Sequence, residues 1–188
     1  MRFKHFIYTA SFVLLLSLQN VFASFIDHPV ESDHWTDKYD RHFKKYSKRY
    51  FGPLFNWHWF KAQAIAESAL DKDAKSLVGA RGLMQIMPGT FEDIKRNNPH
   101  FSKLDSPKWN IAAGIYYNRS IYRKIENSPA QDKLYLTFAS YNAGYGRILN
   151  ASKRIGKKEK DWNEIKEYLP KETRGYVSRI RKLMGENE

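Results

Sequence analysis

The stretch AIAESAL at residues 64–70 places one glutamate, Glu67, near the end of an apolar segment. The segment belongs to a helix that the sequence predicts over residues 57–70, with Phe60 and Ile65 on its apolar side. Burial among apolar side chains disfavours a charged carboxylate and raises its pKa, which suits a general acid near neutral pH. Taken alone, a glutamate at a helix end is more often a solvated or capping residue.

Helical patterns extend on both sides of this segment for almost the whole chain. Aromatic residues recur at spacings of four and three over residues 39–50, which predicts a helix. Gly52-Pro53 follows and is expected to end that helix. Prolines at 88, 107, 129 and 170 mark further helix starts, and a basic helix is expected over residues 145–155. Residues 71–85 are rich in turn signals, and no stretch alternates as paired strands do. The sequence therefore predicts an all-α single domain of roughly seven or eight helices.

The first 23 residues are typical of a signal peptide. Arg2 and Lys4 precede a short apolar run at residues 12–18, and Ala23 stands at the expected cleavage site. The run is shorter than the ~20 residues of a membrane span, so an uncleaved anchor is the less favoured alternative. We expect a signal peptide at 1–23, a flexible lead-in at 24–37 and a catalytic domain at 38–184. The mature protein is then exported to the periplasm or cell envelope, without a stable membrane anchor.

The net charge of +12 favours anionic partners such as nucleic acid, anionic lipid or cell-wall polymer. A solvated basic surface is the simpler alternative. The export signal and the lack of a known binding motif argue against nucleic acid. The absence of cysteine excludes disulfides, thiolate metal sites and a cysteine-linked lipid anchor, and the histidines show no metal-ligand spacing. Neither a metal nor a cofactor is expected.

Three sequence blocks follow Glu67-Ser68 along the chain: GARGLMQIMP at residues 79–88, SYNAG at 140–144 and ETRGY at 172–176. In this order the blocks resemble those of the soluble-type lytic transglycosylase catalytic domain, which has a lysozyme-like all-α fold. The segment YDRHFKKY at residues 39–46 resembles, more narrowly, the catalytic module of membrane-bound two-domain murein transglycosylases. At residues 71–74 the sequence has DKDA, where those two-domain relatives usually have Asn-Pro after the Glu-Ser pair.

The resemblance implies that Glu67 is the single catalytic acid and base. In that chemistry the glutamate protonates the β-1,4 glycosidic oxygen between N-acetylmuramic acid and N-acetylglucosamine. It then removes a proton from the muramic acid 6-hydroxyl, which attacks C1 and yields a 1,6-anhydro sugar. Help from the substrate's own N-acetyl group is expected to replace the second carboxylate of ordinary glycosidases. Two alternatives stay open: a lysozyme-type muramidase that consumes water, and a non-catalytic module for wall binding or assembly. The implied partner is the peptidoglycan strand, and a secretion, conjugation or other envelope-spanning assembly is a further candidate.

Further site residues are implied by the same blocks. A substrate-binding role is expected for Ser76, Gln85, Met87, Tyr141, Asn142, Glu172 and Tyr176. Supporting roles are expected for Ser68, through a turn or the Glu67 carboxyl, and for Gly82, through backbone freedom or close packing.

Structural roles compete with several of these assignments. Met87 and Tyr176 also fit core positions, and Glu172 fits the first turn of a helix, where the helix dipole favours an acid. Asn142 could hold a loop together instead of binding substrate. Asp71 is expected to be a solvated turn residue and not a second catalytic carboxylate.

Overall fold

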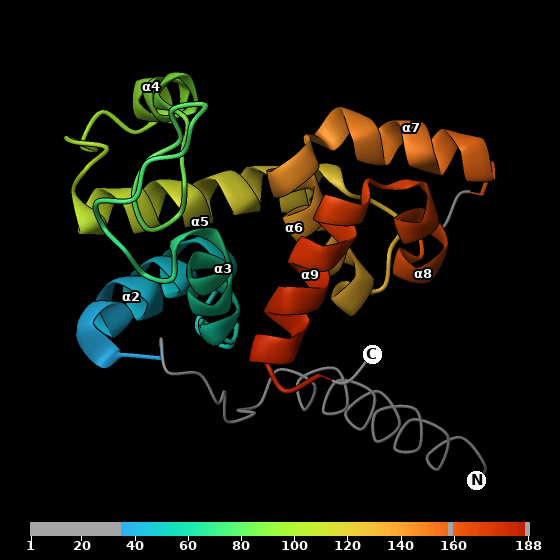
Figure 1. Cartoon of the computed structure of the whole chain (residues 1–188), viewed down its shortest axis with the longest axis horizontal. Coiled ribbons are helices and arrows are strands. Elements are labelled where there is room, and N and C mark those ends of the chain that lie inside the picture. Colours follow the sequence, from blue (N-terminus) through green and yellow to red (C-terminus); the bar gives the residue numbers. More distant parts are fainter. Residues whose placement is uncertain (1–34, 158–159, 187–188) are drawn as a thin grey trace, which may run out of the picture.

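The computed structural model describes residues 35–157 and 160–186 and is all-helical over these residues (Figure 1). Its α-helices are α2 (Asp40–Phe51), α3 (His58–Ser68), α4 (Pro88–Asn97), α5 (Pro107–Lys124), α6 (Ala130–Ala143), α7 (Tyr145–Ile155), α8 (Trp162–Ile165) and α9 (Lys171–Leu183). Two short 3-10 helices are η1 (Asp37–Tyr39) and η2 (Lys166–Tyr168). This confirms the predicted all-α fold. The expected signal peptide and most of the expected lead-in lie outside the described residues.

The helix ends follow local sequence signals. Proline occupies the first turn of α4 and α5, where its missing N–H costs no hydrogen bond. Gly52 and Gly144 close α2 and α6 at φ of 99° and 87°, which a side chain would disfavour. Ser106 stands at the N-cap position before α5, but its hydroxyl makes no capping hydrogen bond.

Helix α5 connects the two halves of the domain. Figure 1 shows α4 above α5, α2 and α3 below it, and α6 to α9 toward the end where α5 continues into α6. Helix α5 packs against α2 and α6, and α9 packs against both α6 and α3. The contact between α9 and α3 is therefore where the C-terminal part of the chain meets the helix that carries Glu67.

The core is built from large aromatic and branched side chains that these helices turn inward. Among the fully buried side chains are Phe43, Trp59, Phe60, Phe138 and Ile111, from α2, α3, α6 and α5. Removing this much apolar surface from water is the main favourable term in folding. None of the described helices is both long enough and apolar enough to cross a membrane.

Candidate active site

Glu67 lies in the last turn of α3, a helix that is buried for most of its length. Its carboxyl group is half-buried, and this burial raises the pKa of Glu67 to about 7. A hydrogen bond from Tyr176 acts in the opposite direction and lowers that pKa, because it stabilises the charged form. Near neutral pH the carboxyl group is therefore present in both its acid and its base form.

Tyr176 reaches Glu67 from α9, 109 positions further along the chain. Its hydroxyl donates to Glu67 Oε1 at 2.6 Å and accepts from Gln63 Nε2 at 3.0 Å. Burial, followed by the charge of Glu67, holds the pKa of Tyr176 well above its ordinary value. The phenol therefore stays protonated and acts as a hydrogen-bond donor to the carboxylate.

Gln63 and Asn118 extend this contact into a buried chain of hydrogen bonds. Asn118 Nδ2 donates to Gln63 Oε1 at 2.7 Å and to the Gly114 carbonyl at 3.0 Å. Gln63 is thus an acceptor at its oxygen, which leaves its amide nitrogen to donate to Tyr176. These residues were missed by the sequence analysis. The usable signal was a glutamine on an apolar helix, four residues before Glu67 and so on the same face.

The chain turns sharply directly after Glu67-Ser68. Ala69 and Leu70 have positive φ of 52° and 61°, a region that non-glycine residues seldom occupy. The Ser68 hydroxyl donates to the Leu83 carbonyl at 2.9 Å and lies 3.2 Å from that of Ala64. The Ser68 hydroxyl therefore contacts backbone carbonyls at the turn, and its hydrogen bond to Leu83 ties α3 to the following loop.

The loop between α3 and α4 holds the GARGLMQIMP block and is braced by its own hydrogen bonds. Ser76 Oγ accepts from the Ala80 amide at 3.0 Å. Gln85, at φ of 44°, donates from its side-chain nitrogen to the carbonyls of Gly82 and Ala74, at 3.0 and 3.3 Å. Both side chains are half-buried and shape the loop itself, whatever further contacts they make with a ligand.

Gly82 is required for two physical reasons. Its φ is 72°, and a Cβ atom there would lie 2.6 Å from Asn110 Nδ2. Asn110 in turn accepts from the Met84 amide at 2.8 Å and donates to the Arg81 carbonyl at 2.9 Å. The backbone freedom and the close packing expected of Gly82 therefore occur together, and Asn110 is a second anchor that the sequence analysis missed.

Tyr141, on α6, contacts the loop between α3 and α4. Its hydroxyl donates to the Met84 carbonyl at 2.7 Å, and its ring meets that of Tyr117 edge-on at 5.3 Å. Burial, and then the charge of Glu67, hold the pKa of Tyr141 well above its usual value. The charge of Glu67 therefore acts on both Tyr141 and Tyr176.

The remaining residues considered for the site are exposed at the surface. Met87 is 42% exposed, which excludes the core role that competed with substrate binding. Asn142 is exposed, and its Oδ1 accepts from the Thr173 hydroxyl at 2.9 Å, so it joins α6 to α9. Glu172 is exposed in the first turn of α9, and Asp71 is exposed in its turn. Among the described residues, no three His, Cys, Asp or Glu side chains are grouped to hold a metal ion.

Comparison with known proteins supplies the family. Residues 44–164 match the transglycosylase SLT domain family. The membrane-bound lytic murein transglycosylase F of Vibrio vulnificus is 34% identical over 120 residues, which are 62% of this chain and 22% of the relative. That of Actinobacillus succinogenes is 30% identical over 148 residues, 75% of this chain and 29% of the relative. The chain thus spans less than a third of the length of these relatives.

Solved structures agree with this assignment. An inactive mutant of the lytic transglycosylase Slt from Pseudomonas aeruginosa matches 80% of this chain and 24% of its own, with a TM-score of 0.68 and 26% identity. The 70 kDa soluble lytic transglycosylase from Escherichia coli matches 81% of this chain and 25% of its own, with a TM-score of 0.65 and 32% identity. From the all-α fold, the ordered sequence blocks and these matches, we conclude that the chain belongs to the transglycosylase SLT domain family.

Proposed function

We propose that this protein is a peptidoglycan lytic transglycosylase and that Glu67 is its catalytic residue. The observation that carries the proposal is the half-buried Glu67 carboxyl, with a pKa of about 7 and a hydrogen bond from Tyr176, in a chain of the SLT family. A group that is half protonated near neutral pH can serve first as an acid and then as a base. The relatives' names as murein transglycosylases support the choice of substrate.

The proposed reaction proceeds in two proton transfers at one carboxyl group. Protonated Glu67 donates its proton to the glycosidic oxygen, and the bond from that oxygen to C1 of N-acetylmuramic acid breaks. The resulting carboxylate accepts the proton of the muramic acid 6-hydroxyl as that oxygen bonds to C1. The product is the 1,6-anhydro sugar, no water is consumed, and Glu67 ends protonated. Tyr176 occupies Oε1, so we assign the proton transfers to Oε2.

The proposed substrate contacts surround this carboxyl. Gln85 uses its side-chain nitrogen on the loop, so its Oε1 is the atom that we assign to a sugar hydroxyl or N-acetyl N–H. Ser76, Met87 and Tyr141 stand on the loop or against it and would line the cleft. Asn142 and Glu172 are assigned to its outer part, because both side chains are exposed near the junction of α6 and α9.

We also propose an extracytoplasmic location. Residues 1–23 would direct export and be removed, leaving residues 24–37 as a lead-in to the catalytic domain at 38–184. The enzyme would then act on peptidoglycan strands in the periplasm or cell envelope, in the service of an envelope-spanning assembly. The relatives are named membrane-bound enzymes, which supports a place of action at the envelope.

The deciding experiment is mass spectrometry of the products that the purified protein releases from peptidoglycan sacculi. We expect muropeptides that end in 1,6-anhydro-muramic acid, with a rate that falls as the pH rises through about 7, because the reaction starts from protonated Glu67. Glu67→Gln should lower the rate by about a thousandfold or more. The control is Glu92→Gln, which changes an exposed glutamate on α4 and should leave the rate unchanged.

Other products would contradict the proposal in distinct ways. Reducing ends in place of anhydro ends would make the protein a muramidase with the same acid. Equal rates for Glu67→Gln and the unsubstituted protein would remove Glu67 from the chemistry. Binding to sacculi without any release of fragments would indicate the non-catalytic wall-binding module.

A further inference from the structure

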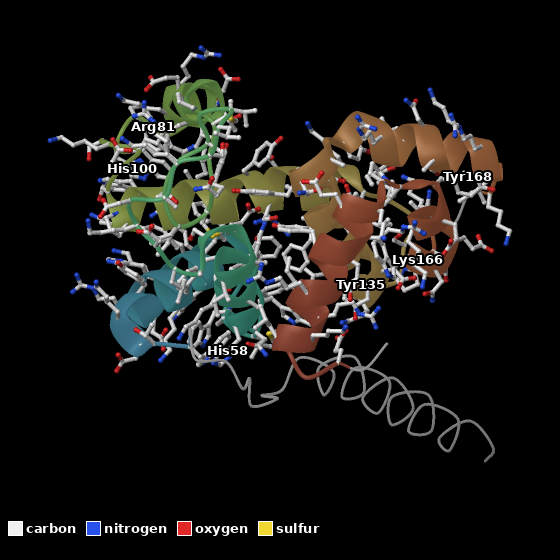
Figure 2. The ribbon with its side chains drawn as sticks, viewed as in Figure 1. His58, Arg81, His100, Tyr135, Lys166 and Tyr168 are labelled. Carbon is white, nitrogen blue, oxygen red and sulfur yellow. The ribbon has the colours of Figure 1, made fainter. Side chains whose placement is uncertain are left out.

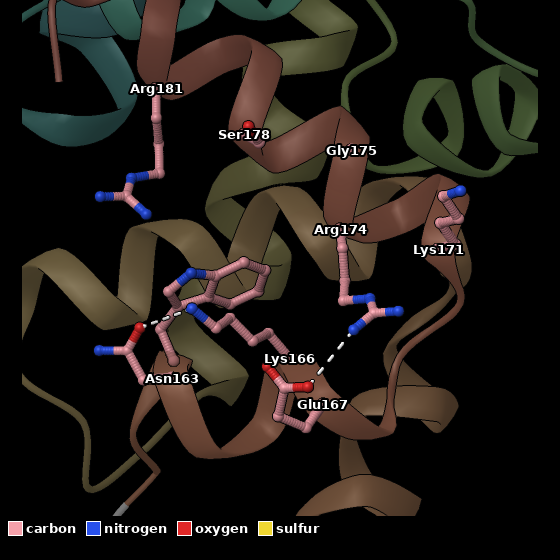
Figure 3. A pocket seen from close by; sticks show the side chains of 9 residues that line it. Asn163, Lys166, Glu167, Lys171, Arg174, Gly175, Ser178 and Arg181 are labelled. Carbon is pink, nitrogen blue, oxygen red and sulfur yellow. Dashed lines mark hydrogen bonds and ion pairs between the residues drawn. The ribbon is translucent and has the colours of Figure 1, made fainter. Parts of the chain in front are cut away.

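A groove of about 650 Å³ runs along α9 on the side that faces α8 and η2 (Figure 3). Figure 3 shows Arg174, Gly175, Ser178 and Arg181 along α9, with Lys166 and Glu167 facing them from η2. The buried indole of Trp162 contributes to the lining. The groove contains none of the residues assigned above to the sugar substrate.

The groove is strongly cationic. Its lining holds Lys166, Lys171, Arg174 and Arg181 but a single carboxylate, Glu167. Arg181 is paired with Glu186 at 2.9 Å, so Lys166, Lys171 and Arg174 carry the charge of the groove. Glu167 lies 3.4 Å from Arg174, and an ion pair this exposed neutralises little. A second hollow shares Gly175 and Ser178 with the groove and adds two further cations on α9, Arg179 and Lys182. A ligand here would therefore meet positive charge along three turns of one helix.

Gly175 supplies an independent observation. A glycine inside a helix costs about 1 kcal/mol relative to alanine. Packing does not explain it here, because a Cβ atom added at Gly175 would meet nothing within 4 Å, and its φ lies outside the left-handed region. The glycine instead keeps the middle of the groove open, where a ligand's backbone could approach α9 closely.

The groove lies on the opposite side of α9 from the candidate active site. Arg174 and Ser178 are each two residues from Tyr176, and two residues of an α-helix subtend about 200° around the axis. Figure 2 accordingly places Lys166 beyond α9 from α3, the helix of Glu67. A ligand in the groove would thus leave Glu67 accessible.

We propose that this groove binds an acidic peptide segment of a partner protein. Carboxylates of such a segment would pair with Arg174 and with the lysines on both walls, since guanidinium groups bind carboxylates in a bidentate manner. The recessed lining lacks the exposed large apolar side chains that insert into a membrane surface. It also lacks an exposed aromatic face, which single-stranded nucleic acid and sugar rings use for stacking. A protein segment fits this chemistry best.

The test is fluorescence anisotropy of the full-length protein with a fluorescein-labelled peptide of alternating glutamate and alanine. The same peptide with glutamine in place of glutamate is the uncharged control. The combined variant Lys166→Ala, Lys171→Ala, Arg174→Ala should weaken binding by at least about tenfold. The matched control Arg41→Ala, Lys45→Ala, Lys108→Ala removes three charges from another basic hollow and should weaken it by less than about threefold.

A second variant keeps the test independent of charge. Gly175→Leu fills the groove without changing net charge and retains a good helix former, so it should also weaken binding by about tenfold or more. Amide resonances of Gly175 and Ser178 should shift when the peptide is added, while those of Arg41 and Lys108 stay in place.

Three results would overturn the proposal. The first is an equal loss of binding in both charge variants, which would indicate attraction to the overall positive charge. The second is undiminished binding by Gly175→Leu, or no binding by the unsubstituted protein. The third is displacement of the labelled peptide by soluble muropeptides or phosphatidylglycerol vesicles at lower concentrations than by unlabelled peptide, which would assign the groove to the wall or to lipid. Circular dichroism of each variant verifies that the helices are retained.

Discussion

At the scale of single residues, the chemistry depends on how far the Glu67 carboxyl is buried and on which side chain donates a hydrogen bond to it. Burial raises its pKa to about 7, and Tyr176 holds that pKa below the value that burial alone would set. Gln63 orients the phenol by donating to it, so the hydroxyl proton is directed to Glu67. The acid and its donor therefore act as a pair.

Removing the phenol should move the pH dependence in a defined direction. In Tyr176→Phe the carboxylate loses a donor, its charged form is less stable, and the pKa of Glu67 rises. We expect the alkaline fall in anhydro-muropeptide release to move up by about one pH unit, measured as initial rates over a pH series. Tyr145→Phe is the control, because that hydroxyl donates to the Lys124 carbonyl, outside the site. An unchanged or downward-shifted profile would contradict the role given to Tyr176.

At the scale of elements, replacing a glycine by alanine should have opposite effects in α5 and in α9. A Cβ at Gly114 would lie 2.8 Å from Met84 Cβ, because α5 there supports the loop that holds the GARGLMQIMP block. A Cβ at Gly175 would meet nothing. Gly114 is thus needed for close packing against Met84, whereas Gly175 weakens its helix without any packing requirement.

This contrast can be measured by urea denaturation. Gly175→Ala should raise the free energy of unfolding by about 0.5–1 kcal/mol, which is the difference in helix propensity. Gly114→Ala should lower it by about 1–3 kcal/mol, because the new methyl group overpacks against Met84. Changes of the same sign in both variants would show that the surroundings of these glycines are not as described.

At the scale of the whole molecule, an ion pair between a buried lysine and a partly buried aspartate joins α3 to α2. Lys61 on α3 is 1% exposed, and its Nζ lies 2.5 Å from Asp40 Oδ1 on α2. The same ammonium lies 4.5 Å from the ring centre of Trp35, which stacks on His58. The start of the described chain is therefore held against the helix that carries Glu67.

Replacing only the aspartate of this pair should lower the free energy of unfolding far more than replacing both charged residues. Asp40→Ala leaves the Lys61 charge buried and should lower the free energy of unfolding by about 3 kcal/mol. The double variant Asp40→Leu, Lys61→Met should recover most of that loss, because neither side chain then carries a charge. Asp93→Ala breaks an exposed pair with Arg96 and should change stability by less than about 1 kcal/mol. A double variant as unstable as Asp40→Ala would contradict this account.

Local signals in the sequence determined most of the helices. Prolines start α4 and α5, glycines follow α2 and α6, and the apolar spacing of α3 is visible without any structure, because each signal acts within a few residues. The same holds for the ordered sequence blocks that led to the family. The predicted helix over residues 57–70 was too long by its last two residues, since Ala69 and Leu70 turn with positive φ.

Only the tertiary structure decided what surrounds Glu67. Tyr176 is separated from it by 109 positions, and Gln63 from Asn118 by 55, so no local pattern could pair their hydrogen bonds. The cationic groove likewise depends on how α9 packs beside α8 and η2, although its charges are visible in the sequence. Helix starts and ends are local backbone events, whereas a carboxyl group's pKa depends on burial and on donors that distant segments bring to it.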